Sequence, residues 1–107
     1  MQLSLKGKTV VVTGAAGGIG LATISLLLQY KVKILALDIQ KPTSKILKNK
    51  NVFYQQIDLV DEKKLSSKIK DFKKKYKRID YLVNTTGVLW FGNCLLYTSD
   101  AADDSRS

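Results

Sequence analysis

The sequence contains no histidine and only one cysteine, and both scarcities exclude classes of site. A disulfide framework needs paired cysteines, and a zinc site of the Cys/His type needs several such ligands together. No run approaches the roughly 20 apolar residues of a membrane helix. A secretory signal is not expected either, since Lys6 and Lys8 come early and the next apolar run breaks at Thr13 and Gly14. We therefore expect a cytoplasmic protein with no metal site and no membrane partner.

Acidic residues are also few, nine against eighteen basic ones, which gives a net charge of +9. Such a charge can indicate a nucleic-acid partner, but nine of the basic residues fall between Lys63 and Arg78. They alternate with apolar residues spaced four, three and four apart, namely Leu65, Ile69, Phe72 and Tyr76. This spacing predicts one apolar stripe on a helix, with the lysines on its solvent face. We expect no nucleic-acid partner, although anionic ligands would be weakly attracted to this face.

The chain is organised around a glycine-rich stretch at residues 13–20, Thr-Gly-Ala-Ala-Gly-Gly-Ile-Gly. It follows an apolar run at residues 10–12 and precedes a helical pattern that begins near Ile19. A helix start offers unpaired N–H groups and a partial positive charge, so a turn that aims it at a pyrophosphate forms a phosphate cradle. A side chain at Gly14 would block the tight turn, one at Gly18 would hold phosphates away, and one at Gly20 would separate helix from strand.

Four short strand patterns alternate with helical ones. We expect strands at residues 8–13, 32–37, 51–57 and 81–83, and helices at residues 18–30 and 62–77. Residues 40–50 are expected to form a short helix opened by Pro42 and Thr43, or a loop. Right-handed crossovers then give an α/β fold of the Rossmann type, a doubly wound parallel sheet with strand order 3-2-1-4. The fourth strand would be an unprotected edge.

An aspartate, Asp38, follows the second predicted strand, eighteen residues beyond Gly20. An acidic residue near this offset accepts hydrogen bonds from the adenosine ribose and would repel the 2′-phosphate of NADP. NAD is therefore the expected cofactor. Lys41 would weaken the discrimination, so NADP stays as the less favoured alternative. The other interpretation is local, with Asp38 only starting a turn.

The pattern Thr-Gly-x-x-x-Gly-Ile-Gly after a first strand resembles the cofactor motif of the short-chain dehydrogenase/reductase family. This resemblance implies that Asp58 and Leu59, after the third strand, contact the adenine ring. Residues 84–87, Asn-Thr-Thr-Gly, resemble the family's Asn-Asn-Ala-Gly element, with threonines as departures that bear on cofactor affinity. Asn84 is expected to bridge neighbouring strand ends, and Gly87 to let the backbone approach the cofactor ribose. A local alternative has Asp61 capping the second helix and Asp58 shaping the loop. The expected cofactor-binding residues are Gly14, Gly18, Ile19, Gly20, Asp38, Asp58, Leu59, Asn84 and Gly87.

The family's catalytic Tyr-x-x-x-Lys pair has no counterpart, because none of the five tyrosines precedes a lysine by four residues. We expect no catalytic residue in this chain, which would hold a cofactor without transferring hydride. The resemblance implies an NAD(P)-dependent oxidoreductase that acts on a small-molecule alcohol or carbonyl and is a homo-oligomer at full length. The alternative is a non-catalytic protein that holds or senses a dinucleotide, with its basic helix facing an acidic partner.

Two further resemblances concern the end of the sequence. Residues 87–92, Gly-Val-Leu-Trp-Phe-Gly, are similar to the 2,3-dihydro-2,3-dihydroxybenzoate dehydrogenases, although Trp90 stands where those often carry arginine. Residues 94–107 resemble, through Asp103, the conceptual translation of a transposase adapter used in sequencing libraries. We therefore expect a dinucleotide-binding part at residues 1–93 and a non-native, disordered tail at residues 94–107.

Overall fold

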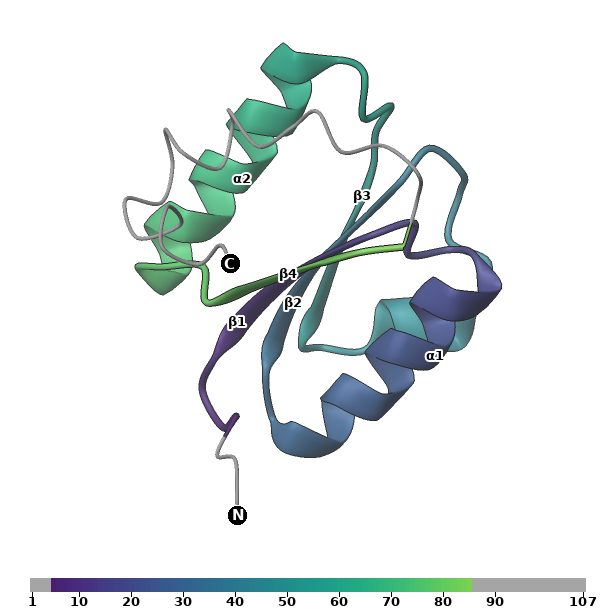
Figure 1. The fold of residues 1–107 in the computed structure, drawn as a ribbon, viewed down its shortest axis with the longest axis vertical. Coiled ribbons are helices and arrows are strands. Elements are labelled where there is room, and N and C mark those ends of the chain that lie inside the picture. Colours follow the sequence, from purple (N-terminus) through teal and green to yellow (C-terminus); the bar gives the residue numbers. More distant parts are fainter. Residues whose placement is uncertain (1–4, 86–107) are drawn as a thin grey trace.

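The structure is a computed structural model that describes residues 5–85 of the chain. A parallel sheet separates two α-helices, so the fold has three layers (Figure 1). In chain order the elements are β1 (Thr9–Thr13), α1 (Gly18–Leu27), η1 (Leu28–Tyr30), β2 (Lys33–Asp38), η2 (Lys45–Lys48), β3 (Val52–Gln56), α2 (Glu62–Tyr76) and β4 (Tyr81–Asn84), where η marks a 3₁₀ helix.

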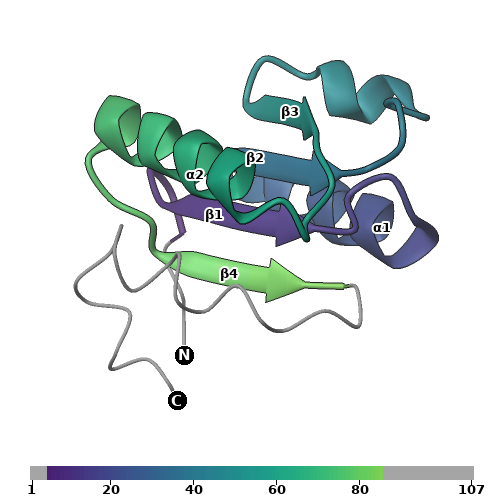
Figure 2. The ribbon, with the colours of Figure 1, turned by 90° about the horizontal axis from the view of Figure 1, so that it is seen from above.

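The four strands are parallel and lie in the order β3-β2-β1-β4, which confirms the predicted order. Val11 of β1 pairs with Leu35 of β2 on one side and with Leu82 of β4 on the other. The sheet seen from above has β4 at one edge and β3 at the other (Figure 2). The order reverses direction between β1 and β4, and ligands of such sheets bind beyond the carboxyl ends of the strands at that point.

Alternation along the strands divides the core into two clusters, one on each face of the sheet. Val10 and Val12 lie in the cluster under α1, and Val11 lies in the cluster under α2. The predicted stripe on α2 is confirmed, because its buried residues are Leu65, Ile69 and Phe72, with Tyr76 packed against them. None of the lysines between these residues is buried.

The helix predicted from residue 18 is confirmed as α1, but its sequence pattern did not identify the buried face. Gly20 and Ile24 are the buried residues of α1, whereas Ile19 is 72% exposed and Leu26 is 55% exposed. Helix α1 has no charged residue, and its apolar residues are spread around its circumference, so periodicity did not distinguish its faces. The face is set instead by Gly20, whose lack of a side chain allows the helix to approach β1.

The segment between β2 and β3 forms the 3₁₀ helix η2, and its start differs from the predicted one. The Ser44 hydroxyl accepts a hydrogen bond from the Ile46 N–H at 3.3 Å and caps the helix. Thr43 instead donates to the Ala16 carbonyl at 3.2 Å. Since this contact spans 27 residues, no local pattern could have indicated it.

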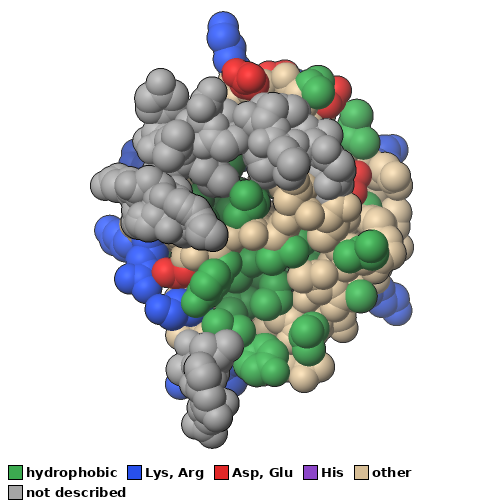
Figure 3. All heavy atoms as spheres, viewed as in Figure 1, with side chains coloured by type: hydrophobic (Ala, Val, Ile, Leu, Met, Phe, Trp, Pro, Cys, Tyr) green, Lys and Arg blue, Asp and Glu red, His purple; other side chains and the backbone are tan. Residues whose placement is uncertain are grey.

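Strand β4 forms an edge of the described sheet, as predicted. Tyr81 is 46% exposed and Leu82 is 37% exposed. Apolar side chains gather at the centre of the face drawn in Figure 3, where Figure 1 has β4. Within residues 5–85, no helix has the length and apolar character needed to cross a membrane.

Candidate functional site

The glycine turn between β1 and α1 gives each predicted glycine a different geometric role. Gly14 has a φ of +71°, in the left-handed region that favours glycine. A Cβ at Gly20 would lie 2.0 Å from the Gly14 carbonyl oxygen and 2.9 Å from Ala15 Cα. A Cβ at Gly18 would meet nothing within 4 Å, because it would point into open space. The turn is therefore closed toward β1 and open toward solvent at Gly18.

The N-terminus of α1 lies at this opening. Gly17 occupies the N-cap position and makes no side-chain cap hydrogen bond, whereas Asp61 caps α2 by accepting from the Lys64 N–H at 3.1 Å. An uncapped helix start that opens on solvent is suited to an anion. Ile19, the next predicted site residue, lies exposed in the same first turn.

Asp38 ends β2 and joins two loops through its carboxylate. Its Oδ2 accepts from the Ala16 N–H and its Oδ1 accepts from the Gln40 N–H, each at 2.9 Å. The side chain is only 9% exposed. Asp38 thus organises the turn that follows it, as the local interpretation expects, and its contact with the ribose stays a prediction. The same carboxylate also fixes the glycine turn, which is a contact across 22 residues.

A pocket of about 160 Å³ lies beside this carboxylate and brings several predicted residues together. It is lined by Gly14, Asp38, Ile39, Ile57, Asp58, Leu59 and Val60. Ile39 is 59% exposed and Val60 is 66% exposed, so two apolar side chains stand in solvent at its rim. Neither residue was among the predicted site residues. The sequence signal that could have identified them is an apolar residue one or two positions after an aspartate at a strand end.

Asp58 and Leu59 line the pocket in different ways. Asp58 is exposed, and its Oδ1 accepts from the Val60 N–H at 3.1 Å. This bond, together with the Asp61 cap, confirms the local alternative for the loop after β3. The Leu59 side chain is buried in the core cluster under α2. Adenine contact by these two residues stays a prediction.

Tyr54 of the neighbouring strand β3 forms a hydrogen bond with the loop after β2. Its hydroxyl donates to the Gln40 carbonyl at 2.5 Å. Burial, and secondarily the negative charge of Asp38, raise the pKa of Tyr54 to about 12 from its ordinary value of 10.0. The hydroxyl therefore stays protonated and able to donate throughout the physiological range.

Asn84 ends β4 and connects it to β1, as predicted. Its Oδ1 accepts from the Thr13 hydroxyl at 2.7 Å. Thr85, one of the departures from the family pattern, donates through its hydroxyl to the Thr13 carbonyl at 2.6 Å and also lies 3.2 Å from the Gly14 carbonyl. This threonine thus ties the end of β4 to the glycine turn. The predicted role of Gly87, the resemblance at residues 87–92 and the tail at residues 94–107 lie outside the described residues.

No cluster of three His, Cys, Asp or Glu side chains that could hold a metal ion occurs within residues 5–85. The site is instead built from backbone N–H groups, two carboxylates and exposed apolar side chains at the carboxyl ends of β1, β2 and β3. That combination suits a ligand with phosphates, hydroxyls and a flat ring.

Comparisons with known proteins agree with this arrangement. A family model described as short chain dehydrogenase matches residues 8–105. Dehydrogenase RED2 of Cochliobolus heterostrophus is 35% identical over 79 residues, which are 74% of this chain and 30% of the relative. Aldohexose dehydrogenase of Thermoplasma acidophilum superposes with a TM-score of 0.67 at 30% identity, over 78% of this chain and 31% of that one.

A short chain dehydrogenase of Leptospira borgpetersenii, solved with bound NAD⁺, superposes with a TM-score of 0.68 at 24% identity, over 78% of this chain and 32% of that one. This likeness concerns the fold. The chain spans about a third of the length of the curated relatives that it matches. Since the family model covers nearly all of the sequence, the chain belongs to the short-chain dehydrogenase family.

Proposed function

We propose that this chain is the dinucleotide-binding part of an NAD(P)-dependent oxidoreductase and that it prefers NAD. The observation that carries the proposal is the single pocket shared by Gly14, Asp38 and Asp58, beside the open, uncapped start of α1. Family membership supports the same activity, since the relatives reported above are dehydrogenases. A bound nicotinamide dinucleotide would supply the acceptor or donor of hydride.

The residues fit the parts of such a cofactor one by one. The open space at Gly18 and the N–H groups around Ile19 suit the pyrophosphate. The Asp38 carboxylate suits the adenosine ribose hydroxyls. Ile39 and Val60, both exposed at the pocket rim, suit the two faces of adenine. Apolar side chains that stand in solvent without a ligand gain stability by covering a flat ring.

NAD is preferred in this proposal because of the Asp38 charge. A 2′-phosphate on the ribose would place a second negative group beside the carboxylate, and like charges at about 4 Å repel by about 4 kcal/mol at an effective dielectric of 20. Lys41 is exposed on the adjoining loop and reduces this repulsion in part. The NAD⁺ in the Leptospira structure is consistent with this preference in a protein of the same fold.

For the whole protein, we propose a small-molecule alcohol or carbonyl substrate, a homo-oligomeric assembly and a cytoplasmic location. The 2,3-dihydro-2,3-dihydroxybenzoate class stays a prediction that rests on residues 87–92. The division at residue 93, with a non-native tail, likewise stays a proposal.

The cofactor preference can be tested by calorimetric titration of NAD and NADP into the wild-type chain and the Asp38→Ala variant. Since Asp38 also fixes the glycine turn, its loss is expected to weaken both ligands, and the ratio of the two dissociation constants is the informative quantity. We expect that ratio to shift toward NADP by about tenfold or more. Asp71→Ala removes an equal charge from the surface of α2 and should leave the ratio unchanged. An unchanged ratio in Asp38→Ala would contradict the ribose role.

A further inference from the structure

The edge of the sheet opposite β4 carries a groove that the proposed dinucleotide site does not use. Within the described sheet, β3 pairs only with β2. Asn51 and Ile57, at the two ends of β3, direct backbone groups toward β2. Because these directions alternate along a strand, Tyr54 and Gln56 direct their backbone N–H and C=O groups outward. Such an edge can pair with another extended segment.

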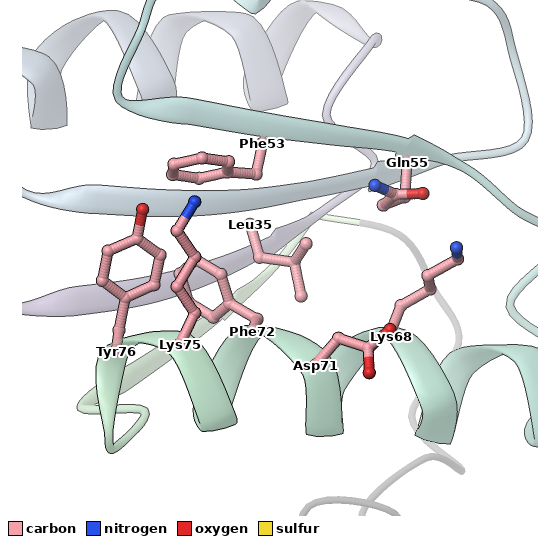
Figure 4. A pocket seen from close by; sticks show the side chains of 8 residues that line it. All are labelled: Leu35, Phe53, Gln55, Lys68, Asp71, Phe72, Lys75 and Tyr76. Atoms are coloured by element: carbon pink, nitrogen blue, oxygen red, sulfur yellow. The ribbon is translucent and has the colours of Figure 1, made fainter.

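One half of the groove is apolar and lies between β3 and α2. It is a pocket of about 160 Å³ whose rings belong to Phe53, Phe72 and Tyr76, with centroids 5.0 to 5.9 Å apart. The Lys75 amino group lies 5.0 Å from the centroid of the Phe53 ring. Figure 4 shows Lys75 and Tyr76 reaching from α2 toward Phe53 on the strand. This half would accept an apolar side chain under a positive charge.

The other half is polar and positively charged. It is a pocket of about 460 Å³ lined by Gln55, Gln56, Ile57, Lys63, Lys64, Ser67 and Lys68. Gln55 and Lys68 line both pockets, so the two form one continuous depression, here called the β3 groove. Within the described part of the chain, none of its three lysines in this half forms an ion pair. Asp71 is the one acidic side chain that lines either pocket.

We propose that the β3 groove binds an extended, acidic segment of a partner polypeptide as an added strand. Lys64 and Lys68 are one helical turn apart, a rise of about 6 Å, and alternate side chains of a strand are about 6.7 Å apart. Acidic residues at alternate positions of the added strand would therefore meet successive lysines. The intervening backbone would pair with Tyr54 and Gln56.

Other occupants fit the groove less well. A second copy of this chain would bring the same lysines against one another, which is electrostatically unfavourable. A nucleic acid would satisfy the lysines but leave the outward backbone N–H and C=O groups of β3 unused. Ile57 is the one residue that lines both the β3 groove and the pocket beside Asp38, and the lysines changed in the test below do not line that pocket.

The test is a fluorescence-anisotropy titration of the full chain with a labelled short peptide. The peptide places one leucine and two glutamates at successive alternate positions, to meet the apolar and the charged half of the groove, with valine at the intervening positions. Lys64→Glu with Lys68→Glu should weaken binding by about tenfold, as expected for two reversed charge pairs. Lys70→Glu with Lys74→Glu is the matched control, because it changes the charge equally on the same helix outside the groove and should alter binding by less than about twofold. Far-UV circular dichroism of both variants establishes that α2 remains folded.

A second peptide tests the backbone hydrogen bonds separately from the charge pairs. Replacing each valine by proline keeps the charge but removes the N–H groups that pair with an edge strand, and should abolish binding. If the proline peptide binds equally well, if the control variant weakens binding equally, or if single-stranded oligothymidine binds more tightly than the acidic peptide, the proposal is overturned.

Discussion

Gly20 controls how closely α1 approaches the sheet, and adding one methyl group there should be severe. The methyl carbon of Gly20→Ala would lie 2.0 Å from the Gly14 carbonyl oxygen, 2.8 Å from the Gly14 carbonyl carbon and 2.9 Å from Ala15 Cα. Ordinary contacts between such atoms are about 3.5 Å, so α1 would have to move by more than about 1 Å. All three obstacles are backbone atoms, and no side-chain rotation can relieve them.

The expected cost of Gly20→Ala is about 3 kcal/mol or more, the upper end for overpacking a core. Since a chain of this size is stable by roughly 5–15 kcal/mol, the loss would be a large share of the total. Urea unfolding followed by far-UV circular dichroism measures it directly. A Gly20→Ala variant within about 1 kcal/mol of the wild type would refute the packing argument.

Gly18→Ala is the matched control, because its methyl group would meet nothing within 4 Å. Its stability should equal or exceed that of the wild type by up to about 1 kcal/mol, since alanine restricts the unfolded chain more than glycine. Its affinity for a dinucleotide should nevertheless fall, because the methyl group would occupy the space assigned to the pyrophosphate. Gly20→Ala therefore tests the effect of the turn on folding, and Gly18→Ala tests its effect on dinucleotide binding.

Two further predictions concern side chains that form hydrogen bonds to the backbone of another segment. Tyr54→Phe should lose about 1 kcal/mol with its bond to the Gln40 carbonyl. Because the folded-state pKa of Tyr54 is raised to about 12, the contribution of its protonated hydroxyl is complete below pH 10 and is lost as the pH rises from 10 toward 12. Unfolding measured across that range should show a weaker alkaline loss in Tyr54→Phe, and an equal loss would contradict the assignment. Asp80→Ala should lose about 2 kcal/mol in urea unfolding, since Asp80 accepts from the Thr9 N–H at 2.8 Å and pairs with Arg78 at 2.7 Å. Asp71→Ala should stay within about 0.5 kcal/mol, and equal losses in the two variants would refute this difference.

The parts of the fold that were predictable had signals contained within one element. The α2 stripe appeared because lysines alternate with Leu65, Ile69 and Phe72, so polar and apolar faces were distinct. The strand order is the exception, because it followed from right-handed connections between alternating strand and helix patterns. By contrast, α1 is apolar on nearly all sides, and the contact that orients it, at Gly20, depends on the path of β1.

The contacts of the candidate site also fall into predictable and unpredictable ones. Asn84 was expected to bridge strand ends, and its bond to Thr13 confirms this. The second contact of Asp38, with the Ala16 N–H, and the bond from Tyr54 to Gln40 join segments 22 and 14 residues apart. Sequence patterns contain no signal for such pairs, because each depends on the sheet register. Ile39 and Val60 were missed because single exposed apolar residues are common in loops. Their significance depends on the pocket that lies between them, which the sequence does not reveal.

The central claim is that this chain binds a dinucleotide through its adenosine and pyrophosphate at the glycine turn. Saturation-transfer difference NMR of NAD with the full chain tests it most directly. We predict transfer to adenine H2 and H8 and to the adenosine ribose H1′, and a marked loss of that transfer in the stably folded Gly18→Ala variant. No transfer to the adenosine protons, or equal transfer with wild type and Gly18→Ala, would contradict the account.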